Sequence, residues 1–267
     1  MSTLVTFHAH PDDEAIATGG TMARAKAEGH RVVLVVATRG ELSSNGHDDL
    51  APGETLRDRR VAEQMKAADE LGVDRVEFLG YHDSGMAGEP TNDAPEAFAS
   101  ADIDEAAARL ARVLDDEAAD VLTVYDHHGT YGHPDHIQVH RVGIRAGELA
   151  GTTRVYEATM NRDYLRRLME MRAAELAEQP DAPDAASMED FGSPEDIITT
   201  TVDVRDYVDQ KRAAMAAHAS QIPSDSFFMA MPLEAFREAF GYEWFIRRDA
   251  PRARETWLFD GVEDVGA

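Results

Sequence analysis

The sequence predicts an α/β protein with a Rossmann-like, mostly parallel sheet, helices on both of its faces, and a C-terminal α+β extension. From residue 4 to residue 159, short apolar segments alternate with longer amphipathic ones, which is typical of βαβ units. Residues 31–37 form one continuous apolar run, RVVLVVA, as expected of a strand buried on both faces of a parallel sheet. Loops that follow parallel strands lie along one edge, where ligands bind in such folds.

The same alternation places the individual elements. Strands are expected at residues 4–7, 31–37, 75–79, 121–125, 154–159 and 197–202. Helices are expected at residues 12–28, 55–71, 102–117, 134–149 and 162–178, and from an Asp203 cap to about residue 219. Gly29 and Gly72 are expected to end the first two helices. Gly19 and Gly20 weaken a helix interior, so we expect them to allow close approach of a neighbouring element.

Composition divides the chain into three regions. Residues 1–178 form the α/β domain, 179–196 an acidic linker or surface loop rich in Pro, Ser and Ala, and 197–267 an extension packed on the same domain. Residues 224–245 are unusually aromatic. We interpret them as a layer packed on the domain, in preference to a pocket wall or a subunit contact.

The charge balance limits the partners. The 51 acidic and 26 basic residues give a formal net charge of -25, which repels nucleic-acid phosphates and anionic membranes. We therefore expect a small-molecule partner, with no nucleic acid and no membrane, and the sequence leaves a homo-oligomer open. The chain has no cysteine, which excludes disulfides and thiolate metal sites. Without a visible signal peptide or apolar span, we expect a cytoplasmic protein.

Two polar clusters follow predicted strands. His10-Pro11-Asp12-Asp13-Glu14 comes after the first strand, and His133-Pro134-Asp135-His136 comes shortly after the strand at 121–125. Alone, either cluster fits a capped turn or a satisfied helix pair. Together they predict a metal site, because residues three apart at a helix start share a direction and a catalytic zinc takes three nitrogen or carboxylate ligands. Two His and one Asp would leave a spare His and a spare Asp, which suits amide hydrolysis.

These clusters resemble the LmbE/PIG-L-like family of zinc-dependent N-acetylglucosaminyl deacetylases. The resemblance covers roughly residues 4–159 and makes residues 1–178 the catalytic domain. It extends through Thr38-Arg39-Gly40-Glu41, Arg60-x-x-Glu63, Leu79-Gly80-Tyr81-x-Asp83-Ser84-Gly85-Met86 and Ala217-His218-x-Ser220-Gln221. The loop at 79–86 is similar to the actinobacterial branch that acts on glucosaminyl-inositol and mycothiol conjugates. That branch typically has Arg at position 82, where this chain has His82.

The resemblance implies a role for each matching residue. It makes His10, Asp13 and His136 the ligands of Zn²⁺, although Fe²⁺ or another divalent ion can occupy such a site. It also implies Asp12 as general base, a protonated His133 for the oxyanion or the leaving amine, Asp135 as the group that orients His133, Tyr131 as carbonyl-polarising residue, and Arg60, Asp83 and His218 as substrate-binding residues. Glu14 is expected only to cap a helix.

The function expected is therefore hydrolysis of an N-acetyl or other N-acyl group on an amino sugar such as an N-acetylglucosaminide, by metal-activated water. An amidase acting on glucosaminyl-inositol (mycothiol-type) conjugates is the nearest alternative. A non-haem iron oxygenase uses the same ligand types, but usually on a double-stranded β fold. A non-catalytic carbohydrate-binding protein with a structural metal would need four protein ligands. The chain has no Gly-x-Ser-x-Gly motif, so serine hydrolysis is not supported. No Gly-x-Gly-x-x-Gly motif follows the first strand, so nucleotide binding is not supported either.

Overall fold

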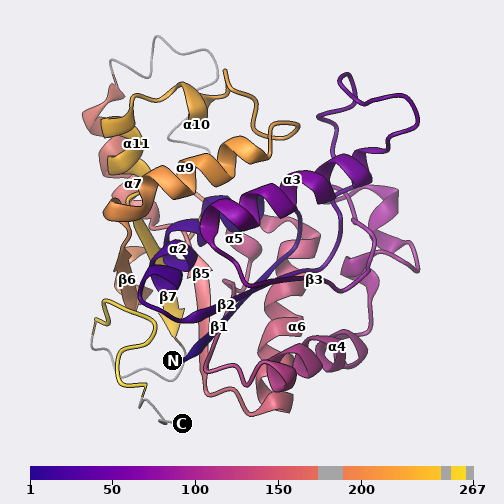
Figure 1. The fold of residues 1–267 in the computed structure, drawn as a ribbon, viewed down its shortest axis with the longest axis horizontal. Helices are drawn as coiled ribbons and strands as arrows, with labels where there is room; N and C mark the ends of the chain where they lie inside the picture. Colours follow the sequence, from indigo (N-terminus) through magenta and orange to yellow (C-terminus); the bar gives the residue numbers. More distant parts are fainter. Residues whose placement is uncertain (174–188, 248–253, 263–267) are drawn as a thin grey trace.

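The computed structural model describes residues 1–173, 189–247 and 254–262, and its strands form one sheet (Figure 1). The strands are β1 (Thr3–His8), β2 (Arg31–Val36), β3 (Arg75–Phe78), β4 (Val121–Tyr125), β5 (Arg154–Thr159), β6 (Thr200–Asp203) and β7 (Tyr242–Arg247). The α-helices are α1 (Asp13–Ala17), α2 (Gly19–Ala27), α3 (Leu56–Leu71), α4 (Ile103–Asp116), α5 (Gly129–Gly132), α6 (Pro134–Ala150), α7 (Arg162–Met171), α9 (Val208–Ala217), α10 (Phe227–Ala230) and α11 (Leu233–Phe240). Short 3₁₀ turns are η1 (Pro90–Asp93), η2 (Phe98–Ser100), η4 (Glu195–Ile197) and η5 (Arg205–Tyr207).

The sheet has the strand order β3-β2-β1-β4-β5-β7-β6. The first five strands of this order are parallel, whereas β7 runs antiparallel to both β5 and β6. The chain order reverses between β1 and β4, which are neighbours. A crevice outside the carboxyl ends of the strands at such a reversal is the usual ligand site. The predicted α/β class and its mostly parallel sheet are confirmed.

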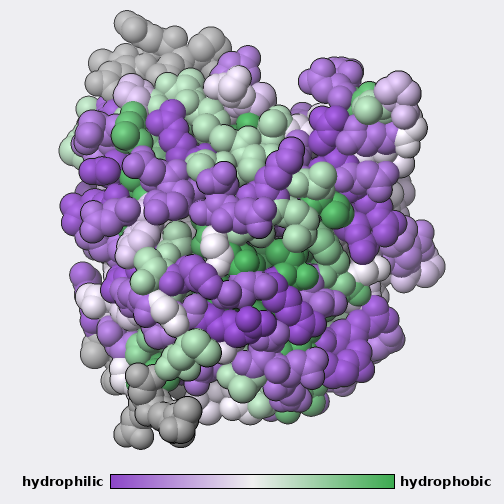
Figure 2. Space-filling model, in the orientation of Figure 1, coloured by the Kyte–Doolittle hydropathy of each residue, from purple (hydrophilic) through white to green (hydrophobic). Residues whose placement is uncertain are grey.

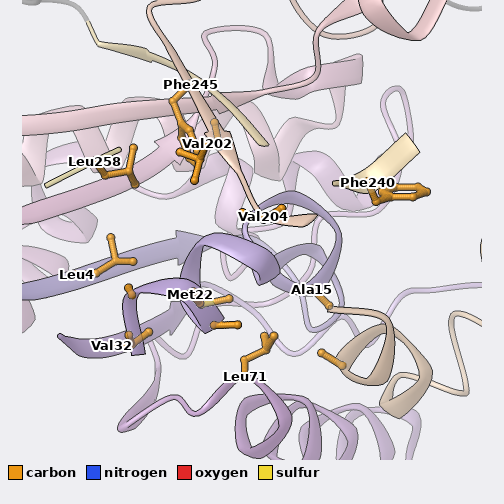
Figure 3. Close-up of a cluster of buried hydrophobic side chains, with 14 of the residues drawn as sticks. Leu4, Ala15, Met22, Val32, Leu71, Val202, Val204, Phe240, Phe245 and Leu258 are labelled. Carbon is orange, nitrogen blue, oxygen red and sulfur yellow. The ribbon is translucent and has the colours of Figure 1, made fainter. Parts of the chain in front are cut away.

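Alternate residues of the central strands face two separate cores. Leu4 and Val32 belong to a cluster shared with α2, α3, α9 and the last strands, part of which Figure 3 shows. Val5 and Val33 face the other side of the sheet, in a cluster shared with α4 and α6. In Figure 1, α3 and α9 lie together on one side and α4 and α6 on the other. Successive side chains of a strand point to opposite faces of the sheet, and both faces are buried here, so the strand sequences are apolar without interruption.

The helix expected at residues 12–28 is two helices, and this expectation was wrong. Thr18 interrupts it with φ −136° and ψ 9°. The Glu243 carboxylate on β7 accepts hydrogen bonds from the backbone N–H groups of Gly20 and Thr21, each at 2.8 Å, and so satisfies the free donors at the start of α2. A Cβ atom on Gly20 would lie 2.5 Å from Cβ of Val204, so the predicted close approach is confirmed there.

The second half of the chain differs more from expectation. The predicted strand at 197–202 begins only at Thr200, and Asp203 is its last residue, paired with Tyr242, so it does not cap α9. Strand β7, which lies between β5 and β6, is not among the strands expected from the sequence. Phe236 and Phe245 of the aromatic segment are fully buried in the core, as expected of a packed layer, while Phe228 lines a pocket described below. Residues 174–178 of the expected helix and 179–188 of the expected linker lie outside the described residues.

The face shown in Figure 2 is mainly hydrophilic, with hydrophobic residues recessed between charged and polar ones. This agrees with a chain in which 29% of the residues are charged. None of the described helices combines the length and the apolar sequence that a membrane span requires.

Candidate active site

The two polar clusters meet at the carboxyl ends of β1 and β4. Asp13 begins α1 directly after the turn that follows β1, and His136 lies in the first turn of α6. The Asp13 carboxylate lies between two imidazoles: Oδ2 is 3.3 Å from Nδ1 of His10, and Oδ1 is 3.3 Å from Nε2 of His136. Burial opposes charge on Asp13, but these histidines more than offset it and hold its pKa well below its ordinary value.

The donor set fits a divalent cation. His136 is 3% exposed, and within the described part of the chain its Nδ1 has no hydrogen-bond partner, while its Nε2 contacts the Asp13 carboxylate without forming a hydrogen bond. One ring nitrogen from each of His10, His133 and His136 lies within 4.8 Å of the other two. Buried imidazoles without hydrogen-bond partners are rare unless they ligate a metal, and imidazole with carboxylate is a typical zinc ligand set.

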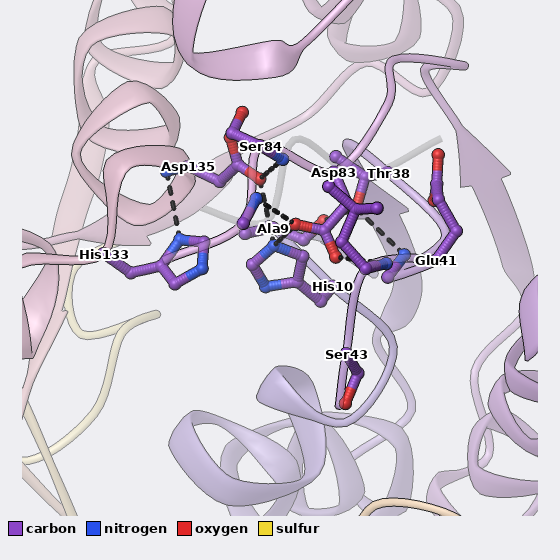
Figure 4. A network of polar contacts seen from close by, with 12 residues as sticks. Ala9, His10, Thr38, Glu41, Ser43, Asp83, Ser84, His133 and Asp135 are labelled. Atoms are coloured by element: carbon purple, nitrogen blue, oxygen red, sulfur yellow. Dashed lines mark hydrogen bonds and ion pairs between the residues drawn. The ribbon is translucent and has the colours of Figure 1, made fainter. Parts of the chain in front are cut away.

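The far nitrogen of His10 is held by other carboxylates (Figure 4). Nε2 of His10 lies 3.0 Å from Oδ2 of Asp135 and 3.5 Å from Oδ1 of Asp83. Ser84 fixes Asp135 in turn, donating from its backbone N–H at 3.0 Å and from its hydroxyl. The pair of His10 and Asp135 thus has the arrangement in which a carboxylate orients a metal-binding imidazole from behind. The Asp135 carboxylate was expected on His133; it lies on His10 because α6 turns its first carboxylate toward the loop after β3.

His133 is oriented by a backbone group instead. Its Nδ1 accepts a hydrogen bond from the N–H of Asp135 at 3.2 Å, which leaves the ring proton on Nε2. Burial and the neighbouring His10 and His136 lower the pKa of His133 to about 4. This direction favours the neutral ring, which still carries one N–H donor. Tyr131 lies beside it, 48% exposed, with ring centroids 6.2 Å apart.

Asp12 has an unusual backbone conformation, with φ 121° and ψ −32°. A non-glycine residue at positive φ costs about 1–3 kcal/mol and persists only when its surroundings hold it. Arg60 holds the side chain, with Nη2 3.1 Å from Oδ2, and also donates to the carbonyl of Pro11 at 2.5 Å and to that of Gly40 at 2.7 Å. Burial raises the pKa of Asp12 to about 6, although Arg60 works against this. A carboxylate near that pKa is suited to accept a proton at neutral pH.

His218 does not lie where a substrate-binding residue would. It is 0% exposed, is absent from the pocket lining, and places Nε2 2.7 Å from Oε1 of Glu14, which is also fully buried. Burial disfavours charge on both groups, but each favours the charged form of the other. The pKa of Glu14 is lowered and that of His218 is raised. The expected substrate contact of His218 is corrected to a buried contact with Glu14.

A pocket of about 450 Å³ opens over this cluster. It brings together most of the predicted site residues: His10, Asp12, Asp13, Arg60, Asp83, Tyr131, His133 and His136. Asp135 and His218 lie behind the wall. Asp83 also accepts from the N–H groups of Leu42 and Gly85, so it joins the loops after β2 and β3 to His10.

Sequence reasoning missed several residues of the wall. Tyr125, the last residue of β4, stacks on His136 with ring centroids 4.5 Å apart, and its hydroxyl lies 2.8 Å from Nδ1 of His8. Phe191 comes from a segment far along the chain, and Gln221 reaches the pocket beside Ser43, whose hydroxyl donates to its side-chain oxygen at 2.6 Å. Phe228 belongs to the aromatic segment for which a pocket wall was the alternative interpretation. The Ala217-His218-x-Ser220-Gln221 motif was the available signal for Gln221.

Comparison with known proteins agrees with this geometry. Residues 5–147 match the family described as PIG-L: GlcNAc-PI de-N-acetylase. This chain belongs to that family. The 1D-myo-inositol 2-acetamido-2-deoxy-alpha-D-glucopyranoside deacetylase of Acidothermus cellulolyticus is 40% identical over 100% of this chain and 99% of its own length. The protein of the same name from Nocardiopsis dassonvillei is 41% identical over 96% of this chain and 99% of its own length.

Solved structures of the same fold come from more distant proteins. The alignment with the N,N'-diacetylchitobiose deacetylase of Pyrococcus horikoshii covers 99% of this chain and 87% of that protein, with a TM-score of 0.58 and 20% identity. The alignment with the conserved protein TT1542 of Thermus thermophilus covers 93% of this chain and 95% of that protein, with a TM-score of 0.58 and 24% identity. These likenesses bear on the fold, whereas the family match confirms the resemblance seen in the sequence. The prediction of an N-deacetylase is confirmed at the level of this family.

Proposed function

We propose that this PIG-L family enzyme removes the acetyl group of an N-acetylglucosaminide, with a divalent metal ion held by His10, Asp13 and His136. The observation that carries the proposal is the Asp13 carboxylate set between those two imidazoles, with the raised-pKa Asp12 next to it in the same pocket. We propose Zn²⁺ as the ion because nitrogen and carboxylate ligands suit it. When bound, it would lower the pKa of a coordinated water and polarise the amide carbonyl.

Each polar group around this point then has a task. Asp12 takes the proton of the attacking water, which its pKa of about 6 allows at neutral pH. The N–H at Nε2 of His133, fixed by the bond that Nδ1 accepts, donates to the developing oxyanion. Asp135 holds His10 in its ligand orientation. Tyr131, whose side chain lines the pocket, donates its hydroxyl to the carbonyl in this proposal.

The acceptor proposed is a glucosaminyl-inositol. The two relatives described above carry the name of a deacetylase for that compound and align over almost their whole length. The pocket offers groups that bind hydroxyls: Ser43, Asp83 and Gln221 in the part of the wall formed by the loops after β2, β3 and α9. Family membership favours this hydrolase over the oxygenase and over a non-catalytic carbohydrate-binding protein. We also propose that residues 1–178 and 197–267 act as one catalytic unit in the cytoplasm.

Acetate release tests the proposal. The purified protein would be incubated with glucosaminyl-inositol N-acetate, simple N-acetylglucosaminides and N-acetylated amines without a sugar, with and without a chelator. We expect acetate from the sugar substrates, fastest from the inositol conjugate, loss of release with chelator, and recovery on adding Zn²⁺. Release that is insensitive to complete metal removal would refute the metal-dependent mechanism. Equal rates on the amines without a sugar would refute the substrate.

A further inference from the structure

The two oxygens of the buried Glu14 carboxylate contact different parts of the chain. Its exposure is 0%, and its Oε2 accepts a hydrogen bond at 3.0 Å from the backbone N–H of Asp12, two residues earlier. Its Oε1 lies 2.7 Å from Nε2 of His218, which comes from the end of α9. An ionised carboxylate only accepts hydrogen bonds, so the His218 ring donates. Glu14 thus connects the candidate general base to a segment 204 residues away.

The bond to the N–H of Asp12 acts on a residue with an unusual backbone conformation. At φ 121° the Asp12 backbone lies outside the regions that L-residues ordinarily adopt. Its carboxylate is held by Arg60 at 3.1 Å, while its N–H is held by Glu14, so the side chain and the backbone are fixed from different directions. Such a conformation persists when surrounding contacts determine it.

The segment that carries His218 is itself anchored at three points. His218 contacts Glu14 on α1, the Ser220 hydroxyl donates to Glu63 on α3 at 2.6 Å, and Gln221 accepts from Ser43 in the loop after β2 at 2.6 Å. The ring of His218 is therefore fixed relative to α1, α3 and a pocket loop at once. This arrangement explains why a chain segment far from the metal ligands has three polar residues in five positions.

We infer that Glu14 and His218 form a positioning pair for Asp12: His218 orients the Glu14 carboxylate, and Glu14 holds the Asp12 backbone at positive φ so that its side chain faces the attacking water. This inference rests on the proposed function in giving Asp12 the role of base. Neither residue of the pair touches the substrate, since His218 and Glu14 are both absent from the pocket wall.

Four single variants and one double variant test it. Glu14→Ala removes the acceptor, while Glu14→Gln keeps an oxygen for the Asp12 N–H and an amide toward His218. Glu14→Ala is expected to lower kcat by about 100-fold, the order of loss from misplacing a reacting group by 1 Å, with KM and bound metal unchanged. Glu14→Gln should regain most of that loss. His218→Ala should lower kcat less than Glu14→Ala does, and His218→Gln should regain most of that loss. The double Ala variant should be no slower than Glu14→Ala alone, because His218 acts through Glu14.

The matched control is Lys211→Met. Lys211 lies on the same helix as His218 and forms an equally buried ion pair, 2.7 Å from Glu243, that does not involve Asp12. It should lower the melting temperature without lowering kcat of the folded protein. If Glu14→Ala does not fold, the two His218 variants carry the test. A loss of kcat in Lys211→Met as large as in the Glu14 and His218 variants, failure of both Gln variants to recover, or additive losses in the double variant would overturn the inference.

A crystal structure of Glu14→Ala, or of His218→Ala if the former does not fold, gives a reading that does not depend on turnover. We expect Asp12 to leave positive φ, and an Asp12 backbone unchanged in that variant would overturn the positioning role whatever the activity. Failure of the proposed function reads differently: the wild-type protein would release no acetate, or Asp12→Asn would keep the wild-type rate. Full kcat in Glu14→Ala beside an inactive Asp12→Asn overturns the positioning inference alone.

Discussion

Replacing Asp135 with Asn should weaken metal binding without unfolding the protein. Asp135 is 0% exposed, and its Oδ2 accepts from Nε2 of His10 and from the backbone N–H of Ser84, both at 3.0 Å. The Asn oxygen can occupy the same position and keep both bonds, while the amide nitrogen replaces the oxygen that accepts from the Ser84 hydroxyl, so the change removes the charge and this one acceptor. A hydrogen bond to a charged group contributes about 1.5–3 kcal/mol and a neutral one about 0.5–1.5. The difference, about 1–1.5 kcal/mol, lies near the 10-fold end of the 10- to 100-fold affinity loss typical of such partners.

The assay is competition for Zn²⁺ between the protein and a chromophoric chelator, beside thermal unfolding of the same samples. Asp126→Asn is the matched control: Asp126 is equally buried, but its carboxylate bonds to Thr130 and Thr159 and not to His10. We expect about 10-fold weaker Zn²⁺ binding in Asp135→Asn and wild-type affinity in the control. Wild-type affinity in a folded Asp135→Asn would refute the view that Asp135 acts through His10.

Asp12→Asn should retain bound metal but lose about 10²- to 10⁴-fold in turnover, as expected on losing a general base; loss of the metal, seen by elemental analysis, would count against that role. Gly20→Ala should destabilise the fold by about 1–3 kcal/mol in urea unfolding, because the added Cβ would lie 2.5 Å from Val204. Gly19→Ala, whose added Cβ would have its nearest neighbour at 3.4 Å, should be neutral or stabilising. Equal effects of the two substitutions would contradict this packing. Hydrogen bonds from Arg31 and Arg75 lower the pKa of Glu117. Its contribution, about 0.5–1 kcal/mol, is therefore present above the unfolded pKa near 4.3 and lost as pH falls through the lower folded pKa. The difference in stability between wild type and Glu117→Gln should narrow as the pH falls below about 4.3, and a difference that is constant with pH would argue against this ion pair.

The parallel half of the sheet could be predicted because its signals are local. The β-branched run of β2, the Thr55 cap and Gly72 end of α3, and the Asp102 cap of α4 each act within a few residues. Parallel strands then bring the loops after them to one edge, so the meeting of His10 and His136 followed from topology without any knowledge of side-chain geometry.

The missed features depend on contacts between distant segments. The break at Thr18 is supported by Glu243, more than 220 residues later, and β7 pairs with strands on both sides rather than showing a strong pattern of its own. Asp135 and His218 carried the correct residue types, but their partners were wrong because sequence spacing does not say which way a side chain turns at a helix start. Glu14 was given only a capping role because its second partner, His218, is supplied by α9.

The place of β7 in the sheet affects how the chain can fold as it is synthesised. β5 precedes β6 in sequence, yet the two strands do not pair, and the strand between them emerges from the ribosome after both. Until residue 247 has emerged, β5 presents an open edge and β6 has no partner, the condition in which nascent chains pair wrongly with one another. On ribosomes stalled before that point, we expect a chain whose parallel strands have formed but whose α2 lacks the hydrogen bonds to Glu243.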